Sequence, residues 1–289
     1  MSAKEYLVCC SFGNDSVALL QHMVDEGLSF DVIYNDTGWA ADGWGERVEM
    51  ISEMLAERSG AKVHITESEG MEALVRRKKG WPMPASKMQF CTQALKERPT
   101  LELLEEIDPQ GESVCVTGIR REESANRSTS PEYLHESPRH GGRDLWMPLV
   151  AMLRQERDEL IRRFGVAVLP HSSRECHPCV CANKTDLREL ASDEQRIAHI
   201  ERIEIDMGFT RNEKPRTMFR PYRVGGGVGI RQAVAWGCGP RGHRATFVPR
   251  PYVYSEQGAT DGENDAAYEE NTRQGLLFER QCDGGYCGT

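Results

Sequence analysis

The sequence lacks the features that would place the protein in or across a membrane. No apolar run among its 289 residues approaches the ~20 residues that a membrane-spanning helix needs. The opening residues, MSAKEYLVCC, lack the basic start and the long apolar stretch of a secretory signal peptide. These absences predict a cytoplasmic protein without a membrane partner, in a compartment that keeps thiols reduced.

Two common nucleotide-binding motifs are missing as well. No strand-to-helix turn carries the GK[ST] ending of a P-loop, and no GxGxxG fingerprint is present. The hydrophobic fraction of 39% and the charged fraction of 28% are those of an ordinary folded chain. A phosphate site in this chain must therefore use a different kind of loop.

Four short apolar runs alternate with helical patterns of apolar residues. The runs predict buried strands at 5–10, 30–36, 61–66 and 113–119. The helical patterns lie at 17–24, 48–55, 92–107 and 153–164. Strands that alternate with helices predict an α/β fold, with a parallel sheet covered by helices on both faces.

The remaining segments are less regular. Residues 120–145 are polar and predict a long loop, and the apolar spacing from Leu187 to Ile203 predicts one amphipathic helix. After about residue 208 glycine, proline and arginine dominate, and we expect the acidic tail 255–289 to be poorly ordered. We therefore expect two domains, at 1–207 and 208–289.

The loop after the first predicted strand has the chemistry of a phosphate site. It reads Ser11-Phe12-Gly13-Asn14-Asp15-Ser16. Small residues let backbone N–H groups approach a phosphate, the next helix adds its positive N-terminal end, and the two serine hydroxyls can donate further hydrogen bonds. Asp15 repels phosphate, so it either orients the loop or helps to hold Mg²⁺. The alternative is an ordinary turn in which Asn14 or Asp15 caps the helix.

This loop resembles the PP-loop, SGGxDS, of the ATP pyrophosphatases. With Phe12 it is most similar to the branch that contains phosphoadenylylsulfate (PAPS) reductases and DndC-like DNA phosphorothioation proteins. Four further segments resemble motifs of that branch in the same order: NDTG at 35–38, TGIRREESANRS at 117–128, MPLVAM at 147–152 and ECHPC at 175–179. The resemblance covers residues 7–185 and implies an adenine-nucleotide α-hydrolase-like (HUP/PP-loop) fold.

The resemblance also implies roles for individual residues. Ser11, Gly13, Asn14, Asp15 and Ser16 would cradle the phosphates of ATP or of an adenylylsulfate. Asp36 and Thr37 would lie beside the nucleotide at a strand's carboxyl end, and Gly118 would permit a close backbone approach. Arg120, Arg121 and Arg127 would neutralise phosphate or sulfate. The alternative for these arginines is a solvated loop in which they pair with Glu122 and Glu123.

The ten cysteines, in a reducing compartment, favour metal binding or thiol chemistry over disulfides. The densest group is Cys176, Cys179 and Cys181, and Cys91 resembles a position where iron–sulfur members of the family carry a CCxxRK motif. Phe90 replaces the first cysteine of that motif. We expect a [4Fe–4S] cluster on Cys91, Cys176 and Cys179, with Cys181 as the fourth ligand or one iron left open. Zinc and a metal-independent redox CxxC are the alternatives.

The tail carries two more cysteines, Cys282 and Cys287, between glycines in QCDGGYCG. A thiol there could carry a persulfide or attack a bound intermediate. The PAPS reductases use a cysteine near their C-terminus, but this chain lacks the histidine that follows it in that family. The alternative is that both cysteines complete a metal site with Cys176 and Cys179.

Residues 211–250 are strongly basic in a chain whose net charge is −9. Nine lysines and arginines stand there against one acid, interleaved with Phe219, Tyr222, Trp236 and Phe247. Guanidinium groups bind phosphates and aromatic rings stack on unpaired bases, so this segment predicts nucleic-acid contact. The alternative is a solvated loop or one that folds over the enzyme's own nucleotide.

Three functions remain open on the sequence. The first is an ATP-dependent sulfurtransferase that modifies DNA or tRNA, with a cysteine desulfurase or thioredoxin supplying or resolving sulfur. The second is an oxidoreductase that forms sulfite from adenylylsulfate or PAPS, with Cys287 as the attacking thiol. The third is a nucleotide-binding protein without activity. The sequence leaves the oligomeric state open.

Overall fold

A computed structural model describes residues 5–83, 89–125, 127–219 and 229–239. Contacts between residues divide the chain into two compact units. Among the described residues, unit 1 contains 5–74 and 89–177, and unit 2 contains 75–83 and 178–239. The boundary expected after residue 207 falls inside unit 2, so compactness and sequence pattern divide the chain at different points.

Unit 1 is built around a six-stranded sheet in the order β3-β2-β1-β4-β6-β5. The strands are β1 (Tyr6–Cys9), β2 (Phe30–Asn35), β3 (Val63–Thr66), β4 (Val114–Thr117), β5 (Tyr133–Leu134) and β6 (Leu145–Trp146). All neighbouring pairs are parallel except β5 and β6, which are antiparallel. The first four strands confirm the predicted parallel α/β fold.

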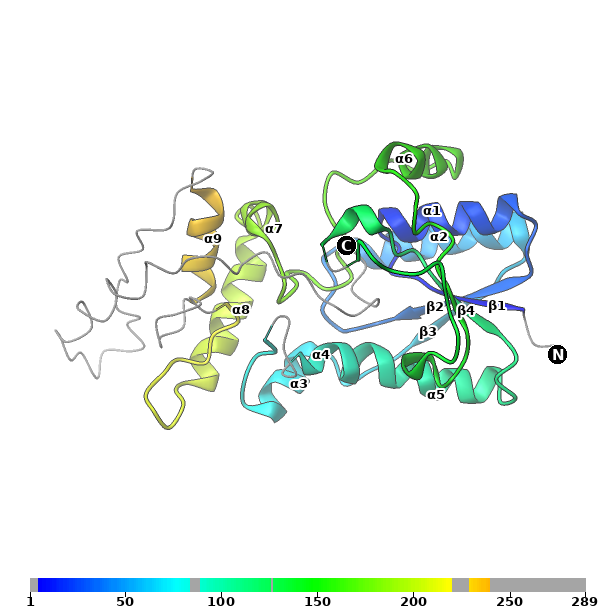
Figure 1. Cartoon of the computed structure of the whole chain (residues 1–289). Coiled ribbons are helices and arrows are strands. Elements are labelled where there is room, and N and C mark those ends of the chain that lie inside the picture. Colours follow the sequence, from blue (N-terminus) through cyan, green and yellow to red (C-terminus); the bar gives the residue numbers. More distant parts are fainter. Residues whose placement is uncertain (1–4, 84–88, 126, 220–228, 240–289) are drawn as a thin grey trace. The chain divides into compact units, whose positions relative to one another are not determined.

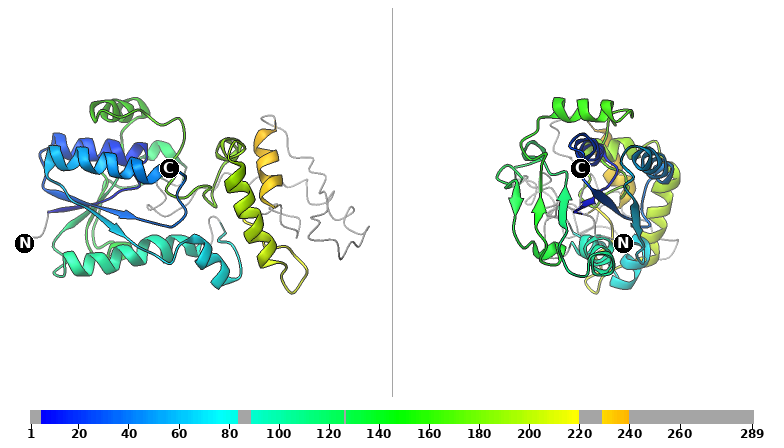
Figure 2. Two further views of the ribbon diagram at one scale, coloured as in Figure 1. Left: turned by 180° about the vertical axis from the view of Figure 1, so that it is seen from behind. Right: turned by 90° about the vertical axis from the view of Figure 1, so that its right-hand side faces the viewer.

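Helices cover both faces of this sheet (Figures 1 and 2). On one face lie α1 (Asn14–Asp25), α2 (Trp44–Ser59) and α6 (Arg154–Arg163), with α6 packed on α1. On the other face a continuous helical run consists of α4 (Phe90–Thr92), the π-helix η1 (Gln93–Glu97) and α5 (Arg98–Ile107). Val8, Leu19, Leu20 and Ile51 are fully buried between α1, α2 and the sheet, where apolar burial stabilises the layers.

The predicted loop 120–145 is wrong in part. It contains β5, β6 and the short 3₁₀ helices η2 (Arg121–Glu123) and η3 (Pro138–His140). Two-residue strands carry no alternating pattern long enough to be recognised in a sequence. Here the pairing of Leu134 with Leu145 adds the antiparallel edge of the sheet.

The described part of unit 2 is helical. It contains α7 (Lys184–Leu190), α8 (Glu194–Met207) and α9 (Ile230–Cys238), and α3 (Met71–Lys78) spans the boundary between the units. The single helix predicted through Leu187 and Ile203 is wrong. Helix α7 ends at Leu190, and Asp193 caps α8 by accepting a hydrogen bond from the Arg196 N–H. The expectation of irregular structure after residue 208 is also wrong for α9. The described helices include none long and apolar enough to cross a membrane.

Candidate functional site

The order of the strands places a candidate site at the carboxyl ends of β1 and β4. From β1 the chain crosses over to β2 on one side, and β4 joins β1 on the other. Ligands of open α/β sheets bind outside the carboxyl ends of the strands, at such a switch point. The loop 11–16 follows β1, and Gly118 and Arg120 follow β4. The topology therefore brings together two of the five motifs found in the sequence.

The two serines of the loop hold it closed on itself. The Ser11 and Ser16 hydroxyl oxygens lie 3.0 Å apart, and the Ser16 hydroxyl accepts a hydrogen bond from the Ser11 N–H at 3.0 Å. Gly13 is the N-cap of α1, and no side chain caps this helix end. The alternative of an Asn14 or Asp15 cap is therefore wrong. The uncapped N-terminal turn can donate backbone N–H groups to an anion.

Phe12 gives the loop its sharp turn. Its φ of 57° lies in the left-handed region that bulky residues rarely adopt. The side chain is fully buried, and its ring meets the Tyr34 ring edge-on at a centroid distance of 5.4 Å. From α2, the Arg47 Nε–H donates a 2.9 Å hydrogen bond to the Phe12 carbonyl oxygen. Core packing and one arginine therefore hold a backbone shape that glycine adopts without strain.

Two glycines allow other segments to approach the loop closely. A Cβ on Gly13 would lie 2.8 Å from the Ser173 Cβ, and a Cβ on Gly118 would lie 2.9 Å from the Asp15 carbonyl oxygen. The expected close approach at Gly118 is therefore made to the loop's own backbone. The Asn14 side chain donates to the Leu169 carbonyl oxygen and accepts from its N–H, both at 2.9 Å. The Asn14 side-chain amide is therefore bonded within the protein, and the Asn14 backbone remains available to a phosphate.

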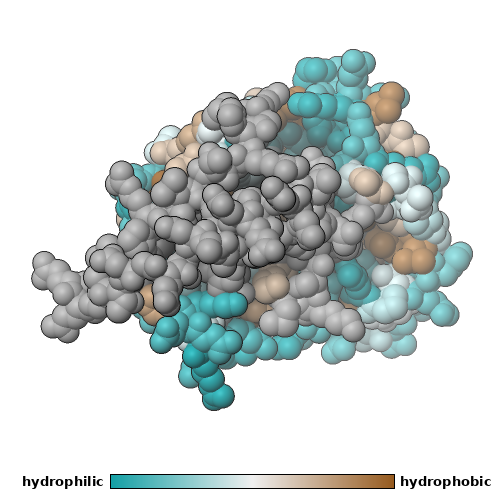
Figure 3. All heavy atoms as spheres, turned by 60° about the vertical axis from the view of Figure 1, so that its left-hand side comes forward, coloured by the Kyte–Doolittle hydropathy of each residue, from teal (hydrophilic) through white to brown (hydrophobic). Residues whose placement is uncertain are grey.

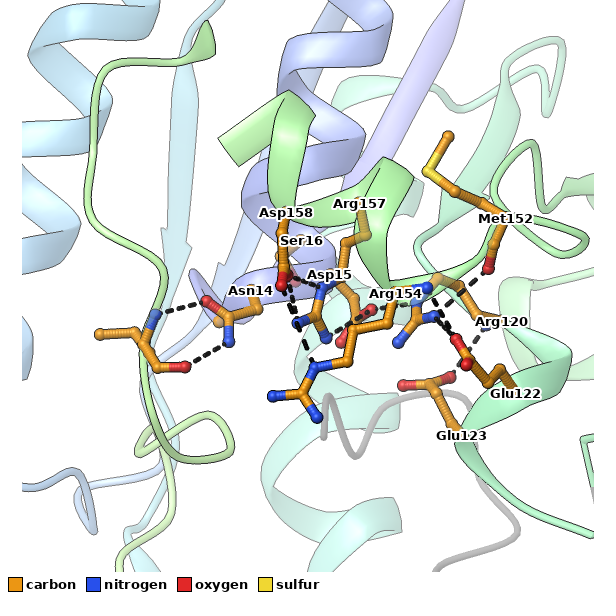
Figure 4. A network of polar contacts seen from close by, with 12 residues as sticks. Asn14, Asp15, Ser16, Arg120, Glu122, Glu123, Met152, Arg154, Arg157 and Asp158 are labelled. Carbon is orange, nitrogen blue, oxygen red and sulfur yellow. Dashed lines mark hydrogen bonds and ion pairs between the residues drawn. The ribbon is translucent and has the colours of Figure 1, made fainter. Parts of the chain in front are cut away.

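Below the loop lies a buried network of charges (Figure 4). The Asp15 carboxylate lies between the guanidinium groups of Arg120 and Arg157, hydrogen-bonded to the Arg120 Nε–H and 3.6 Å from the Arg157 Nη1. Arg120 also donates from Nη1 to Glu122 at 2.9 Å, and Arg157 donates from Nε to Asp158 at 2.8 Å. This arrangement supports the loop-orienting role for Asp15.

Burial has the largest influence on the pKa of the Asp15 carboxyl and raises it, and the charge of Glu123 acts in the same direction. The guanidinium groups of Arg120 and Arg157 oppose this by favouring the ionised form. On Arg120 the same ion pair more than offsets burial and raises the pKa of the guanidinium. The network thus places opposite charges next to each other in a protein interior that would disfavour either charge alone.

The other two arginines of the motif lie differently. Arg121 is exposed, and its Nε–H donates to the Ser130 carbonyl oxygen at 2.9 Å. The Arg127 Nη1 forms an ion pair with Glu123. The sequence alternative is a solvated loop in which these arginines pair with Glu122 and Glu123. Its pairing is found for Arg127 with Glu123 and for Arg120 with Glu122, but the side chains of both arginines are largely buried.

The second motif follows β2. The Asp36 carboxylate accepts a 2.9 Å hydrogen bond from the Gly38 N–H and is exposed, whereas Thr37 is fully buried. The Thr37 hydroxyl donates to the Glu175 carbonyl oxygen at 2.8 Å, and the Cys176 Sγ lies 3.4 Å from the same hydroxyl oxygen. The second motif and the cysteine motif thus meet within unit 1.

The cysteines expected to hold a cluster are divided between the units. Cys91 is buried on α4 and Cys176 is half-buried, both in unit 1. Cys179 and Cys181 belong to unit 2, where the Cys181 N–H lies 3.4 Å from the Cys179 Sγ. Among the described residues, no three His, Cys, Asp or Glu side chains are grouped to hold a metal ion. Cys282 and Cys287 lie outside the described residues, so the four-cysteine site stays a prediction.

Half of the basic segment 211–250 is described. Phe219 is buried, and the Arg231 guanidinium pairs with Glu194 and Glu201 at 2.7 and 2.8 Å. The Lys184 Nζ lies 5.1 Å from the centroid of the Trp236 ring. In unit 2 these groups already have protein partners.

Figure 3 shows described surface that is mainly hydrophilic, with single hydrophobic residues between, as on an ordinary protein surface.

Sequence reasoning missed five residues that the structure brings to this region. Arg157 contacts Asp15, Arg47 contacts Phe12 and Ser173 contacts Gly13, while Lys96 and Glu175 form a buried ion pair. Glu175 begins the cysteine motif ECHPC but was given no role of its own, and the others lie on helices or loops whose sequence is typical of a charged or polar surface. Burial of the charged members is the signal, and it becomes visible only in three dimensions.

Three solved structures are similar to the chain at low identity. The phosphoadenylyl-sulfate (PAPS) reductase from Candida auris, a phosphate complex, is 17% identical over 57% of this chain and 74% of its own, with a TM-score of 0.41. The NMN synthetase from Francisella tularensis is 11% identical over 81% and 84%, with a TM-score of 0.39. The U34-tRNA thiolase NcsA from Methanococcus maripaludis, with its [4Fe-4S] cluster, is 12% identical over 69% and 68%, also with a TM-score of 0.39.

No curated protein matches the chain. A family match at the level of sequence is extensive, however, and includes all the motifs described above. It covers residues 5–185, from β1 through the cysteine motif, and carries the description phosphoadenosine phosphosulfate reductase domain. The chain therefore belongs to the phosphoadenosine phosphosulfate reductase domain family.

Proposed function

We propose that the chain is an ATP-dependent sulfurtransferase that modifies a nucleic acid and binds the nucleotide phosphates at residues 11–16. The observation that carries the proposal is the loop itself. An uncapped helix N-terminus stands at the switch point of the sheet, above a buried Asp15–Arg120 ion pair. Anions bind where backbone N–H groups and a helix dipole point in one direction.

In the proposed reaction an oxygen of the target attacks the α-phosphate of ATP, which forms an adenylylated target and releases pyrophosphate. A sulfur nucleophile then displaces AMP, so the new carbon–sulfur or phosphorus–sulfur bond replaces the bond to oxygen. Ser11 and Ser16 exchange their mutual hydrogen bond for bonds to phosphate oxygens. The backbone N–H donors of the uncapped helix N-terminus are already in place, so they stabilise the developing charge on pyrophosphate without reorganisation.

Mg²⁺ is the expected partner of the pyrophosphate group. Because Asp15 is occupied by two arginines, we assign it to orienting the loop. A [4Fe–4S] cluster, or zinc, on Cys91, Cys176, Cys179 and Cys181 stays a prediction, and no step above depends on it. Anaerobic purification followed by metal analysis and a visible absorption spectrum tests it.

The second candidate is a reductase that takes adenylylsulfate or PAPS as substrate and forms sulfite. The description of the family favours it. Cys287 would attack the sulfur of the bound nucleotide, release the adenine nucleotide and leave a thiosulfonate for thioredoxin to resolve.

The test measures pyrophosphate release from ATP by the full chain, with and without tRNA or DNA. We expect release that a nucleic acid stimulates and that Asp15→Ala and Ser16→Ala each abolish. Asp25→Ala is the matched control, because Asp25 lies at the other end of the same helix. Sulfite formed from adenylylsulfate with thioredoxin, without pyrophosphate release from ATP, would instead establish the reductase.

If the loop variants bind and turn over nucleotide like the wild type, neither enzyme hypothesis survives. Binding of ATP without either reaction in a metal-loaded sample would support a nucleotide-binding protein without activity. The nucleic-acid partner and the sulfur donor, a cysteine desulfurase or thioredoxin, are proposals that the same assays can address.

A further inference from the structure

A single stretch of backbone, residues 169–177, runs from the phosphate loop to the cysteine motif within unit 1. We call it the strap. At its start Leu169 is tied to Asn14 by two hydrogen bonds, and further along Ser173 packs against Gly13. The Ser173 hydroxyl also donates to the Ser11 carbonyl oxygen at 3.3 Å. The first half of the strap therefore contacts three residues of the loop expected to bind phosphate, Ser11, Gly13 and Asn14.

The second half of the strap contacts the segment after β2. The Ala41 N–H donates to the Arg174 carbonyl oxygen at 2.9 Å, and the His177 N–H donates to the Trp39 carbonyl oxygen at 2.8 Å. Between them the Thr37 hydroxyl binds the Glu175 carbonyl oxygen. These contacts fix the strap against the chain that carries Asp36 and Thr37.

A buried ion pair anchors the same half to the opposite face of the sheet. The Lys96 Nζ, on the π-helix η1, bonds to the Glu175 carboxylate, and both side chains are only 6% exposed. Cys91 is buried on the adjoining helix α4. The neighbour of Glu175 in sequence is Cys176, whose Sγ lies 3.4 Å from the Thr37 hydroxyl oxygen. Glu175 is thus held in place by the ion pair, and the next residue of the strap, Cys176, carries a thiol.

We propose that Ser173 and Glu175 are positioning residues that hold the Cys176 thiol in a fixed place relative to the phosphate loop. Ser173 fixes the position of the strap relative to the loop. Glu175, through its ion pair with Lys96, prevents the second half of the strap from shifting. A rigid connection of this kind makes the reactivity of Cys176 depend on whether the loop is occupied. The dependence on occupancy rests on the proposed function, whereas the positioning of the thiol does not.

A structural role alone would stabilise unit 1 without affecting Cys176 in particular. The two explanations differ in what a local loosening of the strap does. If the strap positions the thiol, freeing it must change the access of reagents to Cys176 while the fold stays intact. If it only adds stability, all cysteines respond together or none does.

The first experiment uses the full chain without nucleotide and measures alkylation of each cysteine by iodoacetamide with peptide mass spectrometry. Rates are taken over a range of pH, so that the limiting rate of the ionised thiol is separated from its pKa. We expect Ser173→Ala to raise the limiting rate at Cys176 about tenfold by allowing local opening. Ser172→Ala is the matched control, and Cys238, which is exposed, serves as the internal reference.

Glu175 needs a paired change, because Glu175→Gln alone leaves the Lys96 ammonium buried without its counter-charge. The double variant Lys96→Met/Glu175→Met removes both charges and keeps apolar bulk. We expect it to fold, as judged by circular dichroism, and to raise the Cys176 rate as Ser173→Ala does. Unchanged Cys176 rates in both folded variants would overturn the proposal.

The second experiment adds Mg·ATP to the same alkylation assay. We expect saturating nucleotide to slow alkylation of Cys176 in the wild type and to have less effect in Ser173→Ala, with Cys238 unaffected in both. If ATP binds and the Cys176 rate stays the same, the link between loop and thiol is refuted. If ATP does not bind at all, the proposed function fails, while the experiment without nucleotide still decides the role of the strap.

Discussion

The two units differ in whether their ion pairs are buried. Unit 1 has surface pairs such as Arg162 with Glu159, but it also buries several, among them Asp15 with Arg120, Lys96 with Glu175, and Asp108 with Arg143. Unit 2, in its described part, keeps its ion pairs at the surface, as in Arg76 with Asp206 and Arg231 with Glu194. Its buried carboxylate, Glu204, accepts hydrogen bonds from the Met218 and Ile230 N–H groups.

The difference shows where geometry matters more than stability. Removing two charges from water is costly, and a well-packed apolar pair is often as stable as a buried ion pair. Two of the buried pairs named for unit 1 include a residue of the phosphate loop or of the strap. An exposed pair adds little and tolerates change. The pairs at the phosphate loop and the strap therefore mark residues whose positions matter for more than stability.

The largest effect is expected from Arg120→Met, which leaves Asp15 buried with only the more distant Arg157. Breaking a buried ion pair costs about 3–5 kcal/mol of unfolding free energy. Urea unfolding measures the loss, and Arg121→Met, an exposed neighbour, should leave the midpoint almost unchanged. Equal midpoints for the two variants would contradict the division between buried and exposed charge.

Asp108→Asn tests a buried pair remote from the loop, with an expected loss of about 3 kcal/mol at neutral pH. Burial raises the pKa of Asp108, but hydrogen bonds from Arg143 and from the Ser113 N–H together outweigh it and lower the pKa in the folded state. Its contribution is therefore present above the unfolded pKa of about 3.9 and is lost as the pH falls through the lower folded value. Unfolding measured from pH 7 to pH 3 should show the variant and the wild type converging. A constant difference would refute this assignment.

Glu204→Gln tests the buried carboxylate of unit 2. The glutamine amide keeps one acceptor oxygen but turns an NH₂ group toward the second backbone N–H. The hydrogen bond to a charged group that is lost there contributes about 1.5–3 kcal/mol to the free energy of unfolding. Faster hydrogen exchange at the Ile230 amide should report it. Glu201→Gln, one helical turn away on the surface, is the control and should leave that exchange rate unchanged.

Asp206→Ala should have the smallest effect. Its ion pair with Arg76 is 2.9 Å long, but both side chains are more than 40% exposed. Such pairs contribute about 0.2–1 kcal/mol, and added salt screens them. Thermal unfolding at low and high salt measures it. A loss as large as that for Asp108→Asn would remove the contrast between the two units.

The sequence was sufficient for the central strands β1, β2 and β4 because they are largely buried on both faces. Parallel strands that are covered by helices read as continuous apolar runs, so 30–36 and 113–119 could be assigned without a partner. The break between α7 and α8 was missed although Asp193 is a standard cap, because apolar spacing continues across it. Helix α9 was missed because the glycines around it dominate the local pattern.

For the site, the motifs located the loop but not what supports it. Ser11, Ser16 and Gly118 were identified by residue type and spacing. Asp15 and Arg120 are 105 residues apart, and Lys96 and Glu175 are 79 apart, so only the folded chain pairs them. The roles of Cys282 and Cys287 lie outside the described residues and stay predictions.

The left-handed backbone at Phe12 has a consequence for directed evolution of this protein. A saturation library at this position would face two demands that no residue meets fully. Glycine or asparagine would relax the main chain but leave a void where the ring lies against Tyr34, whereas valine or isoleucine would suit the void poorly and the main chain even less. Phenylalanine is thus a compromise that cannot be improved at one site, and a better loop would require changes at positions 12, 34 and 47 together.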